Sequence, residues 1–428
     1  MGRSQPLRVD ASNVLRALIC RAPLSFPHWH QPLRYDAPME RRIAHLDMDA
    51  FYASVELLRY PQLKGLAVVV GGGRRPGPEP GADLQDFARL RDYVGRGVAT
   101  TASYEARTLG VHSAMGLMKA AALAPDAILL PADFDEYRRY SRRFKAAVAE
   151  IAPHIEDRGI DEIYIDLTDV PGETVSLAQR IKDNVRRTTG LSCSIGITPN
   201  KLLAKIASEL DKPDGLTVLT HADLPTRVWP LPARKINGVG PKASLKLEAL
   251  GIRTIGELAR VPEDLLVQHF GKHYGHWLTE AAHGRDERPV VTESEPKSIS
   301  RETTFERDLD PRRDREALSR ILVSLCESLS HDLTRKGYLG KTIGVKLRYE
   351  DFRTVTRDKT LGSPIDNTVA ILGTARDCLK RVPLDHKLRL LGVRAGSLLR
   401  PGRADAAGVP DPARANESVA GDNLLLFD

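Results

Sequence analysis

Residues 43–58 read IAHLDMDAFYASVELL, and this stretch decides the fold of the first half of the chain. Its first six residues are mostly apolar, which predicts a buried β-strand, and the residues from Asp49 to Leu58 predict a helix that follows it. Asp47 stands at the end of the predicted strand. A single aspartate at a strand end is usually a turn former, so its meaning depends on which other residues reach the same place.

The elements that follow predict a second acidic strand beside the first. We expect helices over 133–151, 176–187 and 200–210, and strands over 154–157, 162–167 and 192–198. Gly159 falls at the tight turn between the first two of these strands. The order β…αββαβ is that of a split ferredoxin-like domain. If its central strands are neighbours, Asp47, Asp161 and Glu162 meet at one edge of the sheet.

Three converging carboxylates indicate a metal site for phosphoryl transfer. Carboxylate oxygens are the ligands that Mg²⁺ prefers, and the carbonyl of Met48 could add a further ligand. Transfer from a nucleoside triphosphate depends on cations that bridge the attacking and leaving oxygens, about 3.5–4 Å apart. We therefore expect two Mg²⁺ ions at Asp47, Met48, Asp161 and Glu162.

The remaining segments differ from one another in composition. Residues 71–97 are rich in Gly, Pro and Arg, with a short helical piece near 86–93, and predict a long surface insertion. Residues 231–290 predict only helices. Residues 291–400 predict a separate α+β module, with a helix over 315–329 and a strand over 344–349. After Arg400 the composition is that of a flexible tail.

Composition and charge limit the possible classes of protein. The 428 residues carry a net charge of +7, and residues 291–400 hold 22 Lys and Arg against 16 Asp and Glu. This fits an anionic partner, although a mildly basic protein reaches the same value without one. No apolar run is long enough to cross a membrane. The four cysteines show no C-x-x-C spacing, so neither disulfides nor zinc are expected.

Several strings resemble the motifs of the Y-family DNA polymerases, in particular the DNA polymerase IV group. They are HLDMDAFYASVE at 45–56, ATTASYEARTLG at 99–110, IDE at 160–162 followed by YID at 164–166, and GITPNKLLAKIASELDKPDG at 196–215. The strings occur in the family's order, and the resemblance covers about residues 40–400. In place of the Ser that usually precedes the second acidic motif, this chain has Gly159.

The resemblance implies a multidomain α+β fold: a ferredoxin-like palm, small fingers, an all-helical helix-hairpin-helix thumb and a C-terminal α+β little-finger domain that grips DNA. The implied boundaries are an N-terminal extension at 1–39, palm at 40–55 and 125–225, fingers at 56–124 with an insertion near 74–92, thumb at 226–290, little finger at 291–400 and a tail at 401–428.

The resemblance also implies roles for single residues. Asp47, Asp161 and Glu162 would be the catalytic metal ligands, and Tyr52 the aromatic gate that excludes a ribose hydroxyl. Thr101, Tyr104, Arg107 and Lys201 would hold the triphosphate, since cations and hydroxyls neutralise or donate to its oxygens.

Two further sites are expected in the thumb and the tail. Gly238 and Gly240, followed by Lys242, resemble a helix-hairpin-helix whose backbone approaches a DNA phosphate. Asn423, Leu424, Leu426 and Phe427 lie in an apolar cluster at the end of a polar tail, which resembles the peptide that docks polymerases on the sliding clamp. In that peptide Asn423 stands where Gln is usual.

Three functions are candidates for this chain. The first is a low-fidelity translesion DNA polymerase without proofreading, a cytoplasmic monomer that uses primed template DNA and deoxynucleoside triphosphates. The second is a non-catalytic relative that binds DNA and recruits other factors, which the presence of all three carboxylates disfavours. The third is a two-metal nuclease, for which a triphosphate-holding set and an aromatic gate have no use.

Overall fold

The chain forms two compact units, one ending at Glu293 and one beginning at Ser294. The computed structural model describes residues 41–73 and 77–401. The predictions for the N-terminal extension, the tail and the clamp-binding residues Asn423, Leu424, Leu426 and Phe427 fall outside the described residues. Among the residues that are described, no helix has the length and apolar character needed to span a membrane.

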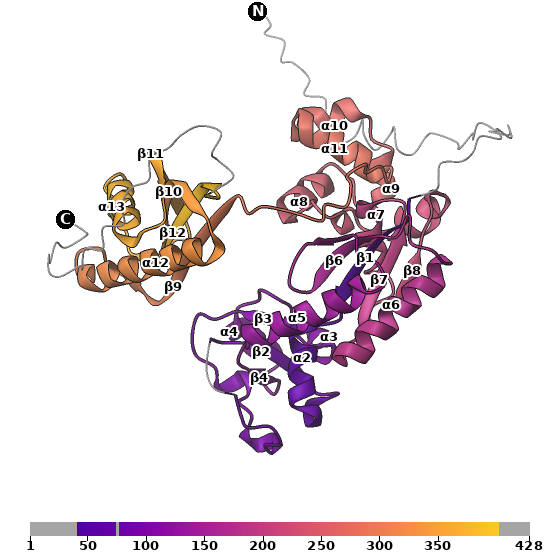
Figure 1. The fold of residues 1–428 in the computed structure, drawn as a ribbon, viewed down its shortest axis with the longest axis horizontal. Helices are drawn as coiled ribbons and strands as arrows, with labels where there is room; N and C mark the ends of the chain where they lie inside the picture. The colour runs from indigo at the N-terminus through magenta and orange to yellow at the C-terminus, as the bar shows by residue number, and fades with distance from the viewer. Residues whose placement is uncertain (1–40, 74–76, 402–428) are drawn as a thin grey trace, which may run out of the picture. The chain divides into compact units, whose positions relative to one another are not determined.

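A five-stranded sheet forms the centre of the first unit (Figure 1). Its strands, in spatial order, are β5 (Ile155–Asp157), β6 (Glu162–Asp166), β1 (Ile43–Met48), β7 (Cys193–Thr198) and β8 (Leu216–Val218). β1 pairs antiparallel with both β6 and β7, while β7 and β8 are parallel. The predicted order β…αββαβ is therefore confirmed, with β1 in the middle of the sheet.

Helices pack on both faces of this sheet, because apolar side chains that alternate along β1 point to one face and the other. Ala44, Leu46 and Met48 of β1 belong to the core that α5 (Phe134–Ala149) and α6 (Thr174–Thr189) cover. On the other face Ile43 packs with Tyr164 and with Ala204 of α7 (Lys201–Ala207). Because Asp47 shares the strand face of Ile43, its side chain projects on the side of α7.

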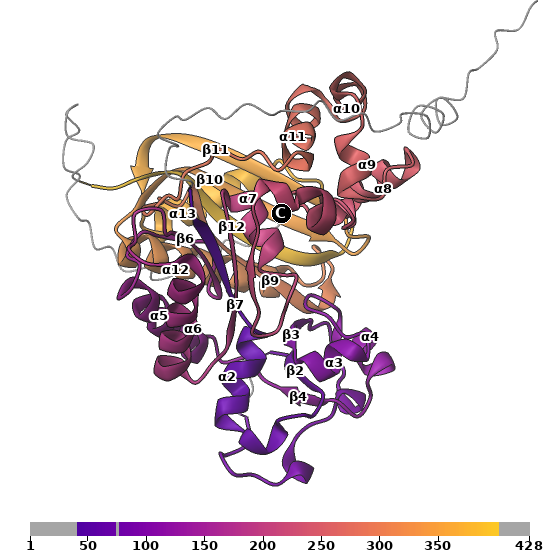
Figure 2. The ribbon, with the colours of Figure 1, turned by 90° about the vertical axis from the view of Figure 1, so that its right-hand side faces the viewer.

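A smaller three-stranded sheet follows β1 in sequence, and Figure 2 shows it from a second direction. Its order is β3 (Ala99–Ala102), β2 (Val68–Gly71) and β4 (Ile128–Leu130), with α2 (Phe51–Arg59), α3 (Tyr104–Thr108) and α4 (Leu117–Leu123) around it. The predicted surface insertion is only partly a surface feature. Phe87 and Leu90 in it are buried, and Phe87 packs edge-on against the ring of Tyr60 at 5.2 Å. Its helical piece consists of two 3₁₀ turns, Leu84–Asp86 and Leu90–Asp92.

Four helices complete the first unit, as the all-helical prediction for 231–290 requires. They are α8 (Pro241–Ala249), α9 (Ile255–Ala259), α10 (Glu263–Phe270) and α11 (Lys272–Ala282). Their core includes Leu247, Leu258 and Leu278, and it is continuous with Leu203 of α7. The helical region is thus anchored to the same helix that covers one face of the five-stranded sheet.

The second unit is a four-stranded antiparallel sheet with two helices. The sheet order is β11 (Thr354–Ile365), β10 (Leu339–Tyr349), β12 (Leu388–Leu399) and β9 (Ser298–Leu309), and the helices are α12 (Arg315–Lys336) and α13 (Thr368–Leu379). Ile343, Val345 and Val393 face the helices and form the core. The α+β prediction is confirmed, and both the predicted helix and the predicted strand are longer than the sequence indicated.

Candidate active site

Two acidic residues lie directly opposite each other at the end of the central strands. Asp47 of β1 is the cross-strand partner of Glu162 of β6, so their side chains project from the same face at adjacent positions. The next residue of β1, Met48, donates its backbone N–H to the carbonyl oxygen of Asp161 at 3.0 Å. The three acidic residues predicted from the sequence are therefore brought together, although Asp47 and Asp161 lie more than a hundred positions apart.

The surroundings of Asp47 and Asp161 penalise their negative charge. Burial raises the pKa of Asp47, although the ammonium group of Lys212 opposes this rise. Burial also raises the pKa of Asp161, and the nearby carboxylate of Glu162 raises it further. A bound cation would favour the ionised form of both carboxylates.

Glu162 differs from the other two carboxylates because it has strong donors. A hydrogen bond from His45 is the main cause that lowers the pKa of Glu162 to about 2, and Lys205 adds to it. The Nε2 atom of His45 lies 3.3 Å from Oε2 of Glu162, and Nδ1 lies 2.8 Å from the hydroxyl of Ser208. Burial lowers the pKa of His45, so the imidazole is neutral at pH 7 and serves as a donor.

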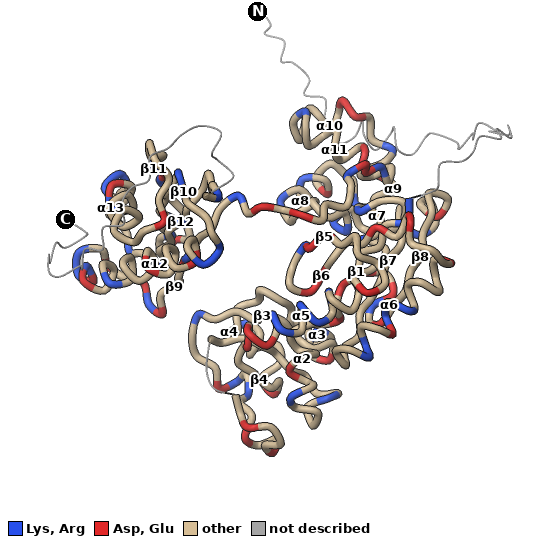
Figure 3. The backbone as a smooth tube through the Cα atoms, in the orientation of Figure 1, with Lys and Arg blue, Asp and Glu red and all other residues tan. Residues whose placement is uncertain are grey.

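Two lysines that the sequence analysis did not single out contact the acidic residues. Lys212 Nζ lies 2.5 Å from Oδ1 of Asp47 and 2.6 Å from Oε1 of Glu209, and Lys205 Nζ bonds Oε2 of Glu162. Although burial opposes the charged form, Asp47 and Glu209 raise the pKa of Lys212. Both lysines lie inside the string at 196–215, so the motif contained the signal. Figure 3 shows acidic and basic residues mingled around β1, β6 and β7.

The oxygen donors at this site are of the kind that bind a hard divalent cation, and the metal site itself stays a prediction. Asp47, Asp161 and Glu162 offer oxygen ligands, which are those that Mg²⁺ takes in proteins. Over residues 41–73 and 77–401, no three His, Cys, Asp or Glu side chains stand in metal-binding proximity, and Asp47 and Glu162 are each held by a lysine instead. A cation at this site therefore requires Lys212 and Lys205 to turn aside, and both have flexible four-carbon side chains.

Tyr52 lies on α2 beside this site. Its ring stacks on that of Tyr137, with centroids 4.4 Å apart and planes at 25°, and meets the ring of Phe134 edge-on at 5.9 Å. Burial raises the pKa of Tyr52, and the carboxylate of Asp161 raises it further. The half-buried ring is thus held by two aromatic side chains and stands near one of the predicted metal ligands.

The residues predicted from the string at 99–110 lie in β3 and α3. Tyr104 donates its hydroxyl to Oδ1 of Asp49 at 3.4 Å, and burial, followed by the Asp49 carboxylate, raises the pKa of Tyr104 to about 12. The guanidinium of Arg107 lies 4.9 Å from the centre of the Tyr104 ring, and its Nε donates to the carbonyl of Ala102 at 3.0 Å. Thr101 is buried in β3. Lys212 and Asp47 are among the charges that act on Tyr104, so its hydroxyl lies near the acidic site.

Lys201 lies apart from the acidic residues. It is the first residue of α7, and its Nζ donates to Oε2 of Glu156 at 2.5 Å and to the carbonyl of Pro289 at 3.1 Å. Glu156 also accepts the backbone N–H of Val291 at 2.8 Å. These contacts fasten the segment after α11 to β5. The ammonium group of Lys201 is thus engaged by Glu156 and Pro289, and its triphosphate role stays a prediction.

The glycines before α8 have different surroundings. Gly238 has a φ of 116°, and a Cβ atom there would lie 2.6 Å from the ring of Trp277. Glycine is therefore required at 238 for the fold itself. Gly240 precedes the first turn of α8, with open space where a Cβ would be, and Lys242 is exposed.

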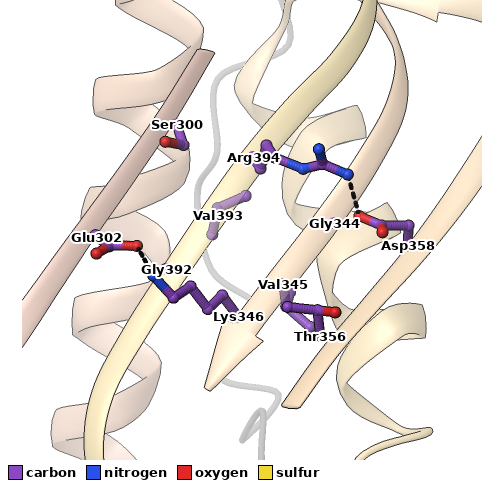
Figure 4. A pocket seen from close by; sticks show the side chains of 10 residues that line it. All are labelled: Ser300, Glu302, Gly344, Val345, Lys346, Thr356, Asp358, Gly392, Val393 and Arg394. Atoms are coloured by element: carbon purple, nitrogen blue, oxygen red, sulfur yellow. Dashed lines mark hydrogen bonds and ion pairs between the residues drawn. The ribbon is translucent and has the colours of Figure 1, made fainter. Parts of the chain in front are cut away.

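A groove of about 350 Å³ lies on the sheet of the second unit (Figure 4). Gly344 and Gly392 leave its floor without side chains; a Cβ at Gly392 would come within 2.8 Å of Cβ of Glu302. Two ion pairs cross it: Lys346 with Glu302 at 2.8 Å, and Arg394 with Asp358 at 3.0 Å. The groove exposes backbone and two cations, each of which is already paired.

Comparison with known proteins gives consistent matches over most of the chain. The model described as the impB/mucB/samB family matches residues 46–209, the model of that family's C-terminal domain matches 296–408, and the model described as DNApol eta/Rev1, HhH motif, matches 231–284. The first match includes all three predicted metal-binding carboxylates.

Relatives and a solved structure agree with these matches. The chain is 40% identical over 364 residues to a DNA polymerase IV of Alkalilimnicola ehrlichii, which covers 84% of this chain and 96% of that protein. It is 40% identical over 362 residues to a DNA polymerase IV of Streptomyces coelicolor, covering 83% of this chain and 71% of that protein. It is also similar to the structure of a Y-family DNA polymerase chimera of Dbh and Dpo4, with a TM-score of 0.71, 26% identity, and coverage of 84% and 99% of the two chains.

Proposed function

Because this chain belongs to the DNA polymerase IV group of the Y-family DNA polymerases, we propose that its nucleotidyl transfer takes place at Asp47, Asp161 and Glu162. The chain is a template-directed, low-fidelity DNA polymerase of the translesion class that extends a primer with deoxynucleotides. The observation that carries the site assignment is the cross-strand register of Asp47 with Glu162, since it places two carboxylates on one face at a strand end.

Metal dependence is typical of this family, and the donor set of this chain fits it. We assign two Mg²⁺ ions to the side chains of Asp47, Asp161 and Glu162 and the carbonyl of Met48. When bound, such cations supply Lewis acidity for the primer hydroxyl and positive charge for the triphosphate. The chain's own part is to hold the three carboxylates in register and to keep Glu162 ionised. The neutral imidazole of His45 contributes by donating to Glu162.

The incoming nucleotide would be held from both sides of the acidic site. Lys212 stands against Asp47, and Tyr104 with Arg107 faces the same charges from α3. When a triphosphate enters, the Lys212 ammonium can exchange the Asp47 oxygen for a phosphate oxygen, which is a stronger acceptor with more charge. Tyr52, fixed by two aromatic neighbours, would then lie under the sugar and exclude a 2′-hydroxyl.

Primed template DNA would be held through its backbone at two places. One is the turn before α8, where Gly240 offers open backbone and Lys242 an exposed cation. The other is the groove of the second unit, with Lys346 and Arg394. Contacts of this kind hold DNA without reading its sequence and weaken strongly with salt.

The other partners follow from the sequence. We propose that the C-terminal residues Asn423, Leu424, Leu426 and Phe427 dock on the sliding clamp, and that the protein acts as a monomer in the cytoplasm. A pull-down of the clamp with the full chain and with a chain ending at residue 422 tests the first of these points. Equal retention of the clamp by the two chains would exclude the peptide as its ligand.

A primer-extension assay with Mg²⁺ and deoxynucleotides tests the assignment of the site. We expect Asp161→Ala to abolish extension while the affinity for primed template is kept, because the carboxylate contacts the cations and not the duplex. Asp169→Ala is the matched control, since Asp169 is an exposed aspartate after the other end of β6. Extension by the Asp161→Ala protein at the unsubstituted rate would contradict the metal assignment.

A further inference from the structure

Lys182 is a buried lysine outside the set of residues assigned to the active site. It lies on α6, and only 7% of its surface is exposed. Its Nζ donates to the carbonyl oxygens of Cys193, Asp214 and Gly215 at 2.8, 2.6 and 3.0 Å, and lies 2.8 Å from Oδ1 of Asp214. Burying an ammonium group is costly unless it is fully bonded, and here most of its bonds go to one turn of the chain.

Asp49 is a buried carboxylate that binds the same turn as an acceptor, whereas Lys182 binds it as a donor. With 2% of its surface exposed, its Oδ2 accepts the backbone N–H of Asp214 and the hydroxyl of Ser192, both at 2.8 Å. Its Oδ1 accepts the hydroxyl of Ser194 at 2.8 Å and that of Tyr104 at 3.4 Å. Asp49 thus joins the start of α2, strand β7, the turn at 212–215 and α3.

The turn at 212–215 carries Lys212, the lysine that contacts Asp47. Asp214 has a φ of 56°, a left-handed conformation that costs energy for a residue with a side chain and persists only when its surroundings enforce it. Asp49 and Lys182 hold the backbone of Asp214, one at its N–H and one at its carbonyl, while Arg186 pairs with its carboxylate and Ser194 accepts the N–H of Gly215. The position of the Lys212 ammonium therefore depends on two buried groups of opposite charge.

We propose that Asp49 and Lys182 are positioning residues for nucleotide binding, which hold the turn at 212–215 so that Lys212 meets the triphosphate over Asp47, while Asp49 also fixes the hydroxyl of Tyr104. The inference rests on the proposed role of Lys212. Two buried charges are an expensive way to hold a core, because apolar side chains of similar volume do so as well or better. Both charges are used to hold one four-residue turn, and the position that this turn gives to the Lys212 ammonium accounts for their presence.

Single-nucleotide insertion kinetics with the full chain test this proposal. Lys182→Met keeps the length of the side chain and removes its four bonds to the turn and β7. We expect the KM for the incoming deoxynucleotide to rise roughly tenfold, with kcat within about threefold and the affinity for primed template unchanged. Asp49→Asn, which cannot accept as many hydrogen bonds, should behave in the same way.

A double-substitution cycle separates positioning from a general loss of structure. In a Lys212→Met background, we expect Lys182→Met to change kcat/KM by less than about twofold, because the group it positions is already gone. If Lys182→Met costs as much in that background as in the unsubstituted chain, the proposal is wrong. Lys182→Gln, which keeps two donors, serves for the same cycle if Lys182→Met does not fold.

Asp332→Asn is the control for the loss of a buried carboxylate. Asp332 lies in the second unit, is 4% exposed and bonds Arg301 and Arg335. Its KM for nucleotide should stay at the unsubstituted value even if its melting temperature falls, and an equal rise in KM would overturn the positioning role. An unsubstituted chain that extends no primer overturns the proposed function itself, whereas normal extension with an unchanged KM in Lys182→Met and Asp49→Asn overturns only the inference about the turn.

Discussion

The acidic end of the five-stranded sheet and the groove of the second unit both place lysine or arginine beside carboxylates on a sheet face, but they differ in burial. In the first, Lys212 and Asp47 are 16% and 15% exposed. In the second, Lys346 and Glu302 are 35% and 43% exposed, and Arg394 and Asp358 are 47% and 41% exposed. Water screens the exposed pairs, so each contributes about 0–1 kcal/mol, whereas the shielded charges act strongly on one another. The same residue types are thus strongly coupled at the acidic end of the five-stranded sheet and only weakly paired at the surface of the groove.

The largest effect is expected for the loss of a carboxylate charge at the acidic end of the five-stranded sheet. Glu162→Gln keeps the shape of the side chain and removes its charge, so we expect primer extension at saturating nucleotide to fall by at least about 10³-fold. Glu302→Gln is the matched change in the groove and should leave kcat within about twofold. Pre-steady-state insertion rates measure both. Similar rates for the two variants would remove the distinction between the regions.

The next largest effect is expected when Lys212 of the acidic site and Lys346 of the groove are each replaced. Lys212→Met should raise the KM for nucleotide by roughly tenfold or more, since a charge-assisted bond to phosphate is lost, with little change in DNA affinity. Lys346→Met should do the opposite: KM stays constant, and the slope of log K against log salt falls by about 1. Insertion kinetics and fluorescence anisotropy at several salt concentrations supply the two quantities. A nucleotide KM raised by Lys346→Met would show that the groove lysine also serves the active site.

A smaller effect concerns the partner carboxylates of the groove. Asp358→Asn removes the negative charge that holds Arg394, and the less firmly held guanidinium should tighten DNA binding by roughly two- to threefold at low salt. The gain should vanish in the double variant Arg394→Met, Asp358→Asn. Anisotropy titrations with primed template measure both. Weaker binding by Asp358→Asn than by the unsubstituted chain would mean that the ion pair organises the groove for DNA.

The smallest expected effect is at Gly159, where the family usually has Ser. A Cβ atom there would lie 3.6 Å from Oδ1 of Asp161 and 3.6 Å from Cγ of Glu162, which is ordinary contact. We therefore expect Gly159→Ser to be accommodated, with kcat and KM within about twofold of the unsubstituted values. A loss of tenfold or more in kcat/KM would show that the hydroxyl disturbs the carboxylates beside it.

Local patterns predicted much of the first unit. The strand predicted over 162–167 is observed as β6, and Ile163 and Ile165 on one face and Tyr164 on the other are buried. The glycine-rich insertion was harder to predict, because Phe87 and Leu90 are isolated apolar residues in a polar segment and have no periodicity to reveal them. Phe87 is buried against the ring of Tyr60, and Leu90 is buried in a cluster with Val69 and Leu117, so both depend on partners elsewhere in the sequence.

The sequence by itself determined that acidic residues end two strands of a ferredoxin-like domain, because strand periodicity and the motif at 45–56 are local properties. Only the tertiary structure decided which lysine faces those residues. Lys201, Lys205 and Lys212 lie in one string, yet Lys201 turns to Glu156 while Lys212 reaches Asp47. The difference arises from the turn at 212–215, whose conformation is imposed by Asp49 and Lys182. Contacts between residues so distant in sequence form only when the chain has folded.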